Sequence, residues 1–501
     1  MTLRNFLSIV TLMALAYGCN SQKDKLKTQK KSLEIDWIYQ VDSLLMPFWM
    51  SEEALGNPSG NYPNYRNSEG HILTYENFDF TSIPKYLTDF LITQPDSLRR
   101  SYIRINSRQI YTYCVAFNLT GNEAYLKNAK LGVEYLLKNG GYTTGSPYTY
   151  WQDGKGMPNK FQSTTQDLAY SLTGLSMYYY LTRDECVLES ILKVKDFVIS
   201  EYYDNSQLKE NTKLVMWVKD NYEGDTVGDK RLLAVLDQLN AYLIFVTPLV
   251  PDNLTETFKH DVKNLAYSLK DNFYDDKYYL FWGDLNNKKM GESPTDFGHS
   301  IKSFWMLYLA GQLLNDDSLV DFANRNAIKL LNTAYIKEDG SWAEMYKDST
   351  LRIVKNKVWW NYAELDQMAA TLSLRDTTLY SKYLKQTYKY WEKNMIDYKN
   401  KEVYFLLDEE GKPNDLGLKT CHWKNGFHSL EHALIGFLST SNYLNDEIPL
   451  YFAFEKDAKP VKSKINPYYY SAEIINYEES EFSNPLLDNL QKTKVTFQNI
   501  N

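Results

Sequence analysis

A helical hydrophobic pattern that runs from Leu33 to Leu444 limits the fold of this 501-residue chain more than any other feature. Apolar residues recur with the 3.6-residue period of an amphipathic helix, as in the stripe that starts with Phe258, Val262 and Leu265. The pattern predicts about twelve helices, at residues 34–48, 100–119, 122–138, 163–182, 184–203, 229–248, 253–274, 297–314, 317–335, 359–374, 376–397 and 428–441.

The predicted helices are of two kinds that alternate along the chain. The second, fourth, sixth and later even-numbered helices are apolar on nearly every side, whereas the odd-numbered ones carry Lys, Glu and Asp on one face. A helix with little polar face is buried by its neighbours, and one with a charged face borders solvent. An inner ring of helices wrapped by an outer ring is an (α/α)6 barrel, so we expect an all-α fold of this type.

The connections between the helices alternate in length. Links from an inner to the next outer helix are short and supply N-cap residues such as Asn122, Asp184 and Asp316. The links from outer to inner helices are long, near residues 139–162, 204–228, 275–296, 336–358 and 398–427. Long loops in a compact domain are usually functional, and these must all leave the barrel at one end. We therefore expect a loop-walled cavity at the starts of the inner helices.

The helical pattern stops after Asn445. Short runs at residues 450–454, 468–475 and 494–497 are typical of strands. We expect residues 33–445 to form the barrel, as a catalytic domain, and residues 446–501 to form a small β-rich appendage packed on it.

The first residues are typical of a bacterial lipoprotein precursor. Arg4 and the apolar residues 6–16 form a signal peptide that is too short to span a bilayer, and residues 15–19 (Leu-Ala-Tyr-Gly-Cys) resemble a lipobox. The resemblance implies removal of residues 1–18, lipidation of Cys19 and a polar tether over residues 19–32. We expect an anchored protein of the bacterial cell envelope, at the periplasmic face or the cell surface. An ordinary secretory peptide with a chance cysteine is the alternative.

Composition narrows the class of ligand. The net charge is −8 and no basic block is present, which argues against a nucleic-acid partner. The 42 tyrosines and 11 tryptophans either thicken the core or bind sugars, because aromatic rings pack against the apolar faces of pyranose rings. The cysteines other than Cys19 are scattered and form no disulfide framework.

Three motifs resemble the N-acylglucosamine 2-epimerase family, which includes cellobiose and mannobiose 2-epimerases and aldose–ketose isomerases. They are Gly-His-Ser-Ile at 298–301, Trp-Trp-Asn-Tyr-Ala-Glu at 359–364 and Trp-Lys-Asn-Gly-Phe-His at 423–428, all at predicted inner helices. The resemblance extends from Leu45 to the helix after His428. It implies a sugar isomerase or epimerase, acting on a mono- or oligosaccharide, that needs neither a metal nor an organic cofactor.

The resemblance also implies the roles of individual residues. His299 and His428 face each other across the cavity; one removes the proton beside the carbonyl of the ring-opened reducing-end sugar, and the other returns it. Imidazole suits both steps because its pKa is near the working pH. Arg108 resembles the arginine that polarises the substrate oxygen. The substrate-binding residues expected around them are Asp167, Asn240, Lys302, Trp305, Trp360, Glu364 and Trp423.

The chain departs from the family at Lys302, where members commonly have glutamate one turn after the first histidine; Leu168 and Tyr362 are further departures. Lys302 shares a helix face with His299. A cation at this corner predicts a cavity that accepts an anionic sugar, such as a uronate or a sulfated unit. The competing hypothesis is that Lys302 pairs with a local carboxylate such as Asp296 and never meets substrate.

Three other functions fit parts of the sequence. A glycoside hydrolase on the same barrel, such as an unsaturated glucuronyl hydrolase, needs catalytic carboxyl groups, for which Asp167, Asp237 and Glu364 are available. Residues 428–432 match a His-x-x-Glu-His zinc pattern, but no third ligand is evident. A carbohydrate-binding lipoprotein without activity is the third alternative.

Overall fold

The computed structural model describes residues 34–77, 85–157, 164–204, 214–220, 226–413, 418–456 and 460–501. The predicted signal peptide, Cys19 and the tether lie outside the described residues. Within the described ranges, no helix is both long and apolar enough to cross a membrane.

The inner ring of an (α/α)6 barrel is formed by helices that pack each against the next, and the last packs against the first to close the ring. Its members are α5 (Ile103–Thr120), α7 (Thr165–Thr182), the composite helix α9 (Leu232–Gln238), η7 (Leu239–Leu243) and α10 (Ile244–Val246), α12 (Phe297–Leu314), α14 (Trp359–Ser373) and α17 (Phe427–Leu444). The predicted fold class is therefore confirmed.

The outer ring alternates with the inner one along the chain. Its members are α2 (Trp37–Tyr39) with η1 (Gln40–Leu45) and α3 (Met46–Trp49); α6 (Glu123–Asn139); α8 (Glu185–Tyr202); α11 (Asp252–Ser268) with η8 (Leu269–Phe273); α13 (Asp317–Ala334); and α15 (Thr377–Leu379), η9 (Tyr380–Leu384), α16 (Lys385–Tyr390) and η10 (Trp391–Met395) in sequence.

Burial explains why the sequence alternates. Every residue of α7 is buried, whereas α6 buries one stripe that includes Tyr125, Ala129 and Leu136 and leaves the other face to solvent. An inner helix must be apolar all round because neighbours surround it, and an outer helix needs only one apolar stripe.

The long connections carry small antiparallel sheets of two or three short strands at the starts of the inner helices. Their strands are β1 (Arg100–Tyr102), β2 (Tyr150–Gln152), β3 (Lys155–Gly156), β4 (Tyr203–Asp204), β5 (Leu214–Val215), β6 (Tyr274–Asp275), β7 (Leu280–Phe281), β8 (Tyr335–Ile336), β9 (Ser341–Trp342), β10 (Met345–Tyr346), β11 (Ile353–Val354), β12 (Lys357–Val358) and β13 (Leu406–Leu407). At the other end, Gly121, Arg183 and Asn315 adopt positive φ angles and end inner helices within short links.

One α-helix among the described residues was not predicted. Helix α4 (Lys85–Thr93) lies among the loops, where Leu87 and Leu91 join a small second core with Tyr65 and Tyr150. A nine-residue helix has little intrinsic stability, so it depends on this tertiary packing, which a periodic pattern does not reveal.

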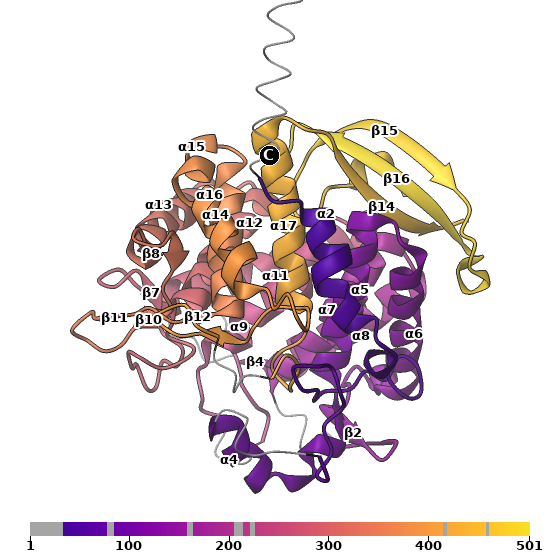
Figure 1. Cartoon of the computed structure of the whole chain (residues 1–501), viewed down its shortest axis with the longest axis horizontal. Coiled ribbons are helices and arrows are strands. Elements are labelled where there is room, and N and C mark those ends of the chain that lie inside the picture. The colour runs from indigo at the N-terminus through magenta and orange to yellow at the C-terminus, as the bar shows by residue number, and fades with distance from the viewer. Residues whose placement is uncertain are drawn as a thin grey trace, which may run out of the picture.

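The C-terminal residues form a three-stranded antiparallel sheet in the order β14–β16–β15, with β14 at Ile448–Glu455, β15 at Glu473–Ser480 and β16 at Leu490–Gln498. In Figure 1 this sheet, in yellow, lies at the end of the barrel opposite α4 and β4. The strand predicted for residues 468–475 is wrong in its first half, because β15 begins only at Glu473. Tyr468 and Tyr470 are buried in the main core instead.

Candidate active site

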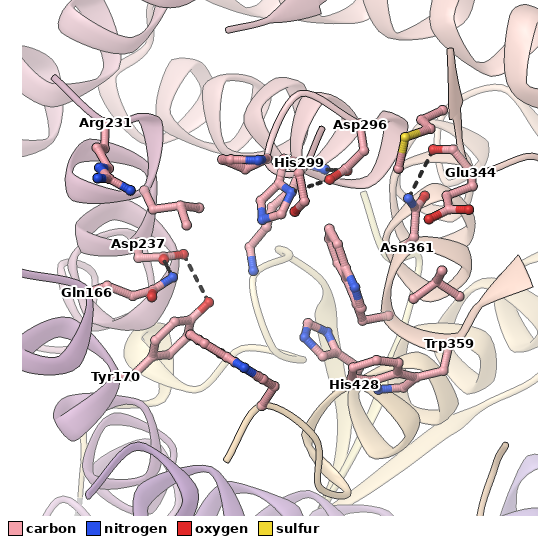
Figure 2. A pocket seen from close by; sticks show the side chains of 18 of the residues that line it. Gln166, Tyr170, Arg231, Asp237, Asp296, His299, Glu344, Trp359, Asn361 and His428 are labelled. Atoms are coloured by element: carbon pink, nitrogen blue, oxygen red, sulfur yellow. Dashed lines mark hydrogen bonds and ion pairs between the residues drawn. The ribbon is translucent and has the colours of Figure 1, made fainter. Parts of the chain in front are cut away.

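A cavity of about 670 Å³ opens where the inner helices begin (Figure 2). Helix α12 contributes His299 and Lys302, α14 contributes Trp359 and Trp360, and α17 contributes His428. The size is typical of a small-molecule site. Aromatic side chains form much of its wall, which suits the apolar faces of sugars; they are Tyr170, Trp217, Trp359, Trp360, Phe405 and Trp423.

His299 is oriented by the residue that caps its own helix. The Asp296 carboxylate accepts a hydrogen bond from the His299 peptide N–H at 2.8 Å and another from ring Nδ1 at 2.7 Å. Because Nδ1 is bound to Asp296, Nε2 is the ring nitrogen that can exchange a proton with a substrate. The imidazole also contacts the Trp360 indole, with ring centroids 4.4 Å apart.

His428 is more deeply buried and has no such local partner. Its Nδ1 lies 3.5 Å from Oε1 of Glu364, too long for a good hydrogen bond. Burial lowers the pKa of His428 well below its usual range, and the positive charges of Lys302 and Arg108 lower it further. The imidazole is therefore neutral at working pH, as a general base must be.

The two imidazoles share one neighbour. The His428 ring lies 6.1 Å from the Trp360 indole that His299 also contacts. Both rings can therefore approach a single sugar held in the cavity.

Arg108, on α5, lines the cavity near His428. It donates from Nη1 to the Trp423 carbonyl at 3.1 Å, and its guanidinium lies 3.8 Å above the Tyr170 ring. No carboxylate among the described residues pairs with it, so its charge is available to a substrate oxygen.

Lys302 pairs with Glu364 of α14, not with Asp296 as hypothesised. Its Nζ lies 3.1 Å from Oε1 of Glu364, and both side chains are buried. Burial is the largest single influence and lowers the pKa of Lys302, but Glu364, Tyr170, Asp237 and Glu431 together outweigh it, so the pKa is raised. Burial in turn raises the pKa of Glu364, against the opposing effect of Lys302.

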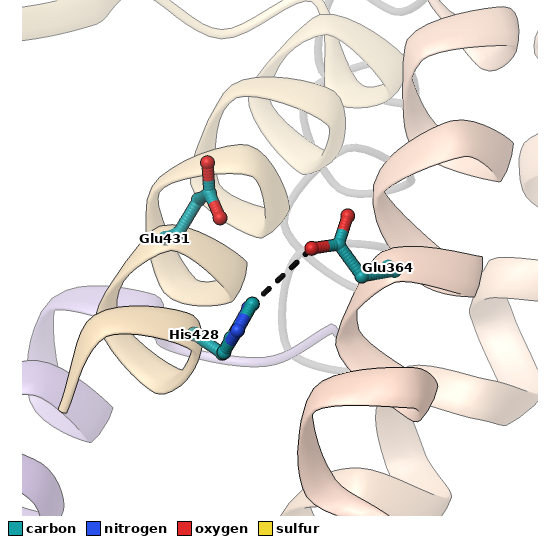
Figure 3. Close-up of side chains that lie close together, drawn as sticks. All are labelled: Glu364, His428 and Glu431. Atoms are coloured by element: carbon teal, nitrogen blue, oxygen red, sulfur yellow. Dashed lines mark ion pairs between the residues drawn. The ribbon is translucent and has the colours of Figure 1, made fainter. Parts of the chain in front are cut away.

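A second carboxyl group, Glu431, lies beneath this pair. Carboxylate oxygens of Glu364 and Glu431 and a ring nitrogen of His428 all lie within 4.8 Å of one another (Figure 3). Burial raises the pKa of Glu431 to about 7, and the neighbouring Glu364 raises it in the same direction. Glutamate and histidine side chains bind metals, but the Lys302 ammonium already supplies a compensating positive charge to the cluster.

Four of the predicted substrate-binding residues do not line the cavity. Asp167 forms an ion pair with Arg104, with oxygen and nitrogen 2.5 Å apart. Asn240 and Trp305 contact Tyr469 in the barrel interior, and Glu364 lies behind Lys302. Lys302, Trp360 and Trp423 do line the cavity, together with His299, His428 and Arg108.

The other histidines of these segments have structural neighbours. His432 bonds through Nε2 to Asp366 at 2.8 Å and packs on Trp391, so it points away from His428 and the zinc pattern is not assembled. His422 accepts or donates a hydrogen bond with Tyr65 and stacks on Phe90, where burial lowers its pKa to about 3.

Asp237 lines the cavity but was not among the predicted substrate-binding residues. Asp237 accepts hydrogen bonds from Gln166 Nε2 at 2.8 Å and from the Tyr170 hydroxyl at 3.0 Å, and all three line one side of the cavity (Figure 2). Asp237 lies one turn before Asn240 on the same inner helix. Only the direction of each side chain separates them, which the sequence pattern does not specify.

Comparisons with known proteins agree with this fold, although no protein-family model matches the chain. A cellobiose 2-epimerase of Dictyoglomus turgidum is 23% identical over 421 residues, covering 80% of this chain and 98% of the relative. The solved cellobiose 2-epimerase of Bacillus thermoamylovorans B4167 has a TM-score of 0.65 at 15% identity, covering 83% of this chain and 100% of that one. A D-mannose isomerase has a TM-score of 0.62 at 15% identity, covering 80% and 96%. The resemblance to the N-acylglucosamine 2-epimerase family that the motifs indicated is thus confirmed over most of the chain.

Proposed function

We propose that this chain is a carbohydrate 2-epimerase or aldose–ketose isomerase that moves a proton at the carbon beside the carbonyl of a ring-opened reducing-end sugar. The observation that carries the proposal is the pair of imidazoles, His299 and His428, which both lie near Trp360 and line one aromatic-walled cavity. The cellobiose 2-epimerase relatives point to the same reaction.

The proposed reaction begins with neutral His428, which takes the C2 proton of the open-chain aldose. The electron pair left behind forms an enediolate, and the unpaired Arg108 guanidinium stabilises its oxygen. His299, which carries a proton on Nε2 as well as on Nδ1 when this reaction begins, delivers the Nε2 proton to the opposite face of C2 to give the epimer. His428 keeps the proton that it removed, and exchange with solvent returns both imidazoles to their starting states. Delivery to C1 with a proton shift from the C2 hydroxyl gives the ketose instead, so no proton or electron is lost in either case.

We infer that a neutral sugar is a better substrate than an anionic one. The expected preference for acidic sugars depended on the Lys302 charge, but Glu364 compensates that charge at 3.1 Å. A cavity of about 670 Å³ with several aromatic walls accommodates at least the reducing end of a disaccharide.

Product analysis tests the proposal. The purified domain would be incubated with cellobiose, with a mannose disaccharide and with an unsaturated glucuronyl disaccharide, and the products followed by NMR. Epimer or ketose formation from a neutral disaccharide is expected. Cleavage of the glycosidic bond would support the hydrolase alternative, and binding without conversion would support a carbohydrate-binding protein.

The hydrolase alternative has less support from the carboxyl groups first considered for it. Asp167 and Glu364 are engaged in ion pairs with Arg104 and Lys302. Of those three candidates, Asp237 alone lines the cavity.

We also propose that the chain is lipid-anchored in the bacterial envelope through Cys19, as residues 15–19 suggest. Replacing Cys19 with Ser should release the protein from the membrane fraction without changing its melting temperature. Unchanged membrane association of the variant would contradict the anchor.

A further inference from the structure

The C-terminal appendage sends a tyrosine into the floor of the barrel. Tyr468 is buried although it belongs to the segment that joins β14 to β15. Its peptide N–H donates to the Tyr180 hydroxyl at 3.0 Å, and that hydroxyl donates to the Asn466 carbonyl at 2.7 Å. The appendage is therefore tied to the inner helix α7 at this point.

The backbone at Tyr468 adopts an unfavourable conformation. Its φ angle is +64°, in the left-handed region that side chains with a Cβ rarely occupy. Such a conformation persists only where surrounding contacts enforce it, and it is often found beside functional sites. Here the enforced conformation directs the phenol toward α17.

The hydroxyl groups of Tyr111 and Tyr468 form a short hydrogen-bonded chain that leads to Glu431. The Tyr468 hydroxyl donates to Oε1 of Glu431 at 2.6 Å, and its oxygen lies 2.6 Å from the Tyr111 hydroxyl of α5. A phenol has one proton, so Tyr111 must be the donor to Tyr468. Two aligned hydroxyl donors stabilise negative charge on the carboxyl group more than one does.

Glu431 connects these two hydroxyl groups to His428. It lies one turn after His428 on α17, and its carboxyl group belongs to the same buried cluster as Glu364 (Figure 3). Lys302 completes the cluster through its ion pair with Glu364. The charge of Glu431 therefore affects both the basicity of His428 and the distribution of negative charge around Lys302.

We propose that Tyr468 is a positioning residue of the active site: its hydroxyl fixes the Glu431 carboxyl group beneath His428, so the appendage completes the catalytic barrel. The sequence predicted only that the appendage packs on the barrel. This inference deepens the proposed function and rests on it for the kinetic consequence, but not for the electrostatic one.

The electrostatic consequence is measurable without turnover. The hydrogen bond from Tyr468 lowers the pKa of Glu431 and so works against burial and Glu364, which hold it near 7. Loss of the hydroxyl should therefore raise that pKa. The titratable groups that face Glu431 are Glu364 on α14, Lys302 on α12, His428 on α17, Tyr111 on α5, and Tyr468, Tyr469 and Tyr470 of the appendage.

The test compares Tyr468→Phe with Tyr470→Phe. Tyr470 is also buried in the barrel floor and also loses one hydroxyl contact, with Thr371 at 2.7 Å, so it controls for stability. In protein labelled with ¹⁵N-histidine, the His428 signal, assigned with His428→Gln, should show an inflection near pH 7 that reports Glu431. The inflection should move up by about one pH unit in Tyr468→Phe and stay in place in Tyr470→Phe.

Kinetics provide the second measurement. We expect kcat of Tyr468→Phe to fall about tenfold with KM nearly unchanged, the rate equivalent of one charge-assisted hydrogen bond. An inflection and a kcat equal to those of Tyr470→Phe would overturn the inference. If Tyr468→Phe does not fold, Tyr111→Phe removes the donor on the barrel side and decides the question by the same shift or its absence. If the wild type converts no sugar, the proposed function fails, whereas the NMR shift still tests the position of Tyr468.

Discussion

The two histidines of the cavity are held in opposite ways. His299 is held by its own helix start, where Asp296 three residues earlier caps the helix and bonds the ring at 2.7 Å. His428 has no local partner, and its surroundings come from Glu364 on α14, Lys302 on α12 and, through Glu431, the appendage. A local carboxylate fixes the tautomer of one ring, whereas a distant network controls the charge around the other.

The largest effect should follow removal of either imidazole. His299→Gln and His428→Gln should each lower kcat by roughly 10² to 10⁴-fold, because both a base and an acid are required. His260, on the exposed face of outer helix α11, offers the control His260→Gln, which should keep wild-type activity. Activity within twofold of wild type in one of the cavity variants would remove that histidine from the mechanism.

Removal of one charge from the buried group of Lys302, Glu364 and Glu431 should strongly destabilise the protein. Lys302→Met leaves Glu364 and Glu431 buried without their cation, which should lower the free energy of unfolding by about 3–5 kcal/mol. Adding Glu364→Gln should restore much of this loss, since the unpaired carboxylate disappears. Chemical denaturation of the two single variants and the double variant measures the coupling. Additive losses would show that the pair is not the source of the effect.

Loss of the Asp296 contact with His299 should have a smaller effect, and it should lower kcat without changing stability. Asp296→Asn keeps a good helix cap and removes the carboxylate that orients the ring. We expect kcat to fall about tenfold, comparable to the loss of one hydrogen bond to a charged group, with little change in melting temperature. Asp184→Asn, which alters the cap of outer helix α8, is the matched control and should leave kcat unchanged. Equal kcat values in the two variants would contradict the role of Asp296.

The smallest effect concerns pH and stability. The pKa of Glu431 is raised from 4.5 to about 7 in the folded protein, so the folded state holds this proton more tightly than the unfolded state. The corresponding stability is complete below pH 4.5 and is lost as the pH rises to about 7. Glu431→Gln should flatten the decrease in melting temperature across this window. A wild-type slope in the variant would show that Glu431 is not the responsible group.

The same contrast explains what the sequence could predict. The barrel followed from alternating apolar and amphipathic helices, and the cavity end followed from alternating short and long links, because both are patterns along the chain. The surroundings of His428 did not follow. Lys302 was expected either to meet an anionic sugar or to pair with a carboxylate near in sequence such as Asp296, but ring closure brings it to Glu364 on the next inner helix.

The C-terminal appendage shows the same limit of prediction from local sequence patterns. Three consecutive tyrosines favour a strand by propensity, yet Tyr468 and Tyr470 fill space inside the barrel that no local pattern describes. Likewise, Asn240 was chosen over Asp237, although only Asp237 faces the cavity. Side-chain direction within a fully buried helix depends on neighbours that are distant in sequence.

Deuterium transfer from solvent tests the central claim most directly. The wild type, His299→Gln and His428→Gln would be incubated with cellobiose in deuterium oxide, and the C2 proton of the reducing-end sugar followed by NMR. The proton-transfer mechanism predicts replacement of this proton by deuterium in product formed by the wild type, and no replacement with His428→Gln. Product that keeps its original proton at C2 would contradict proton exchange through the histidine pair.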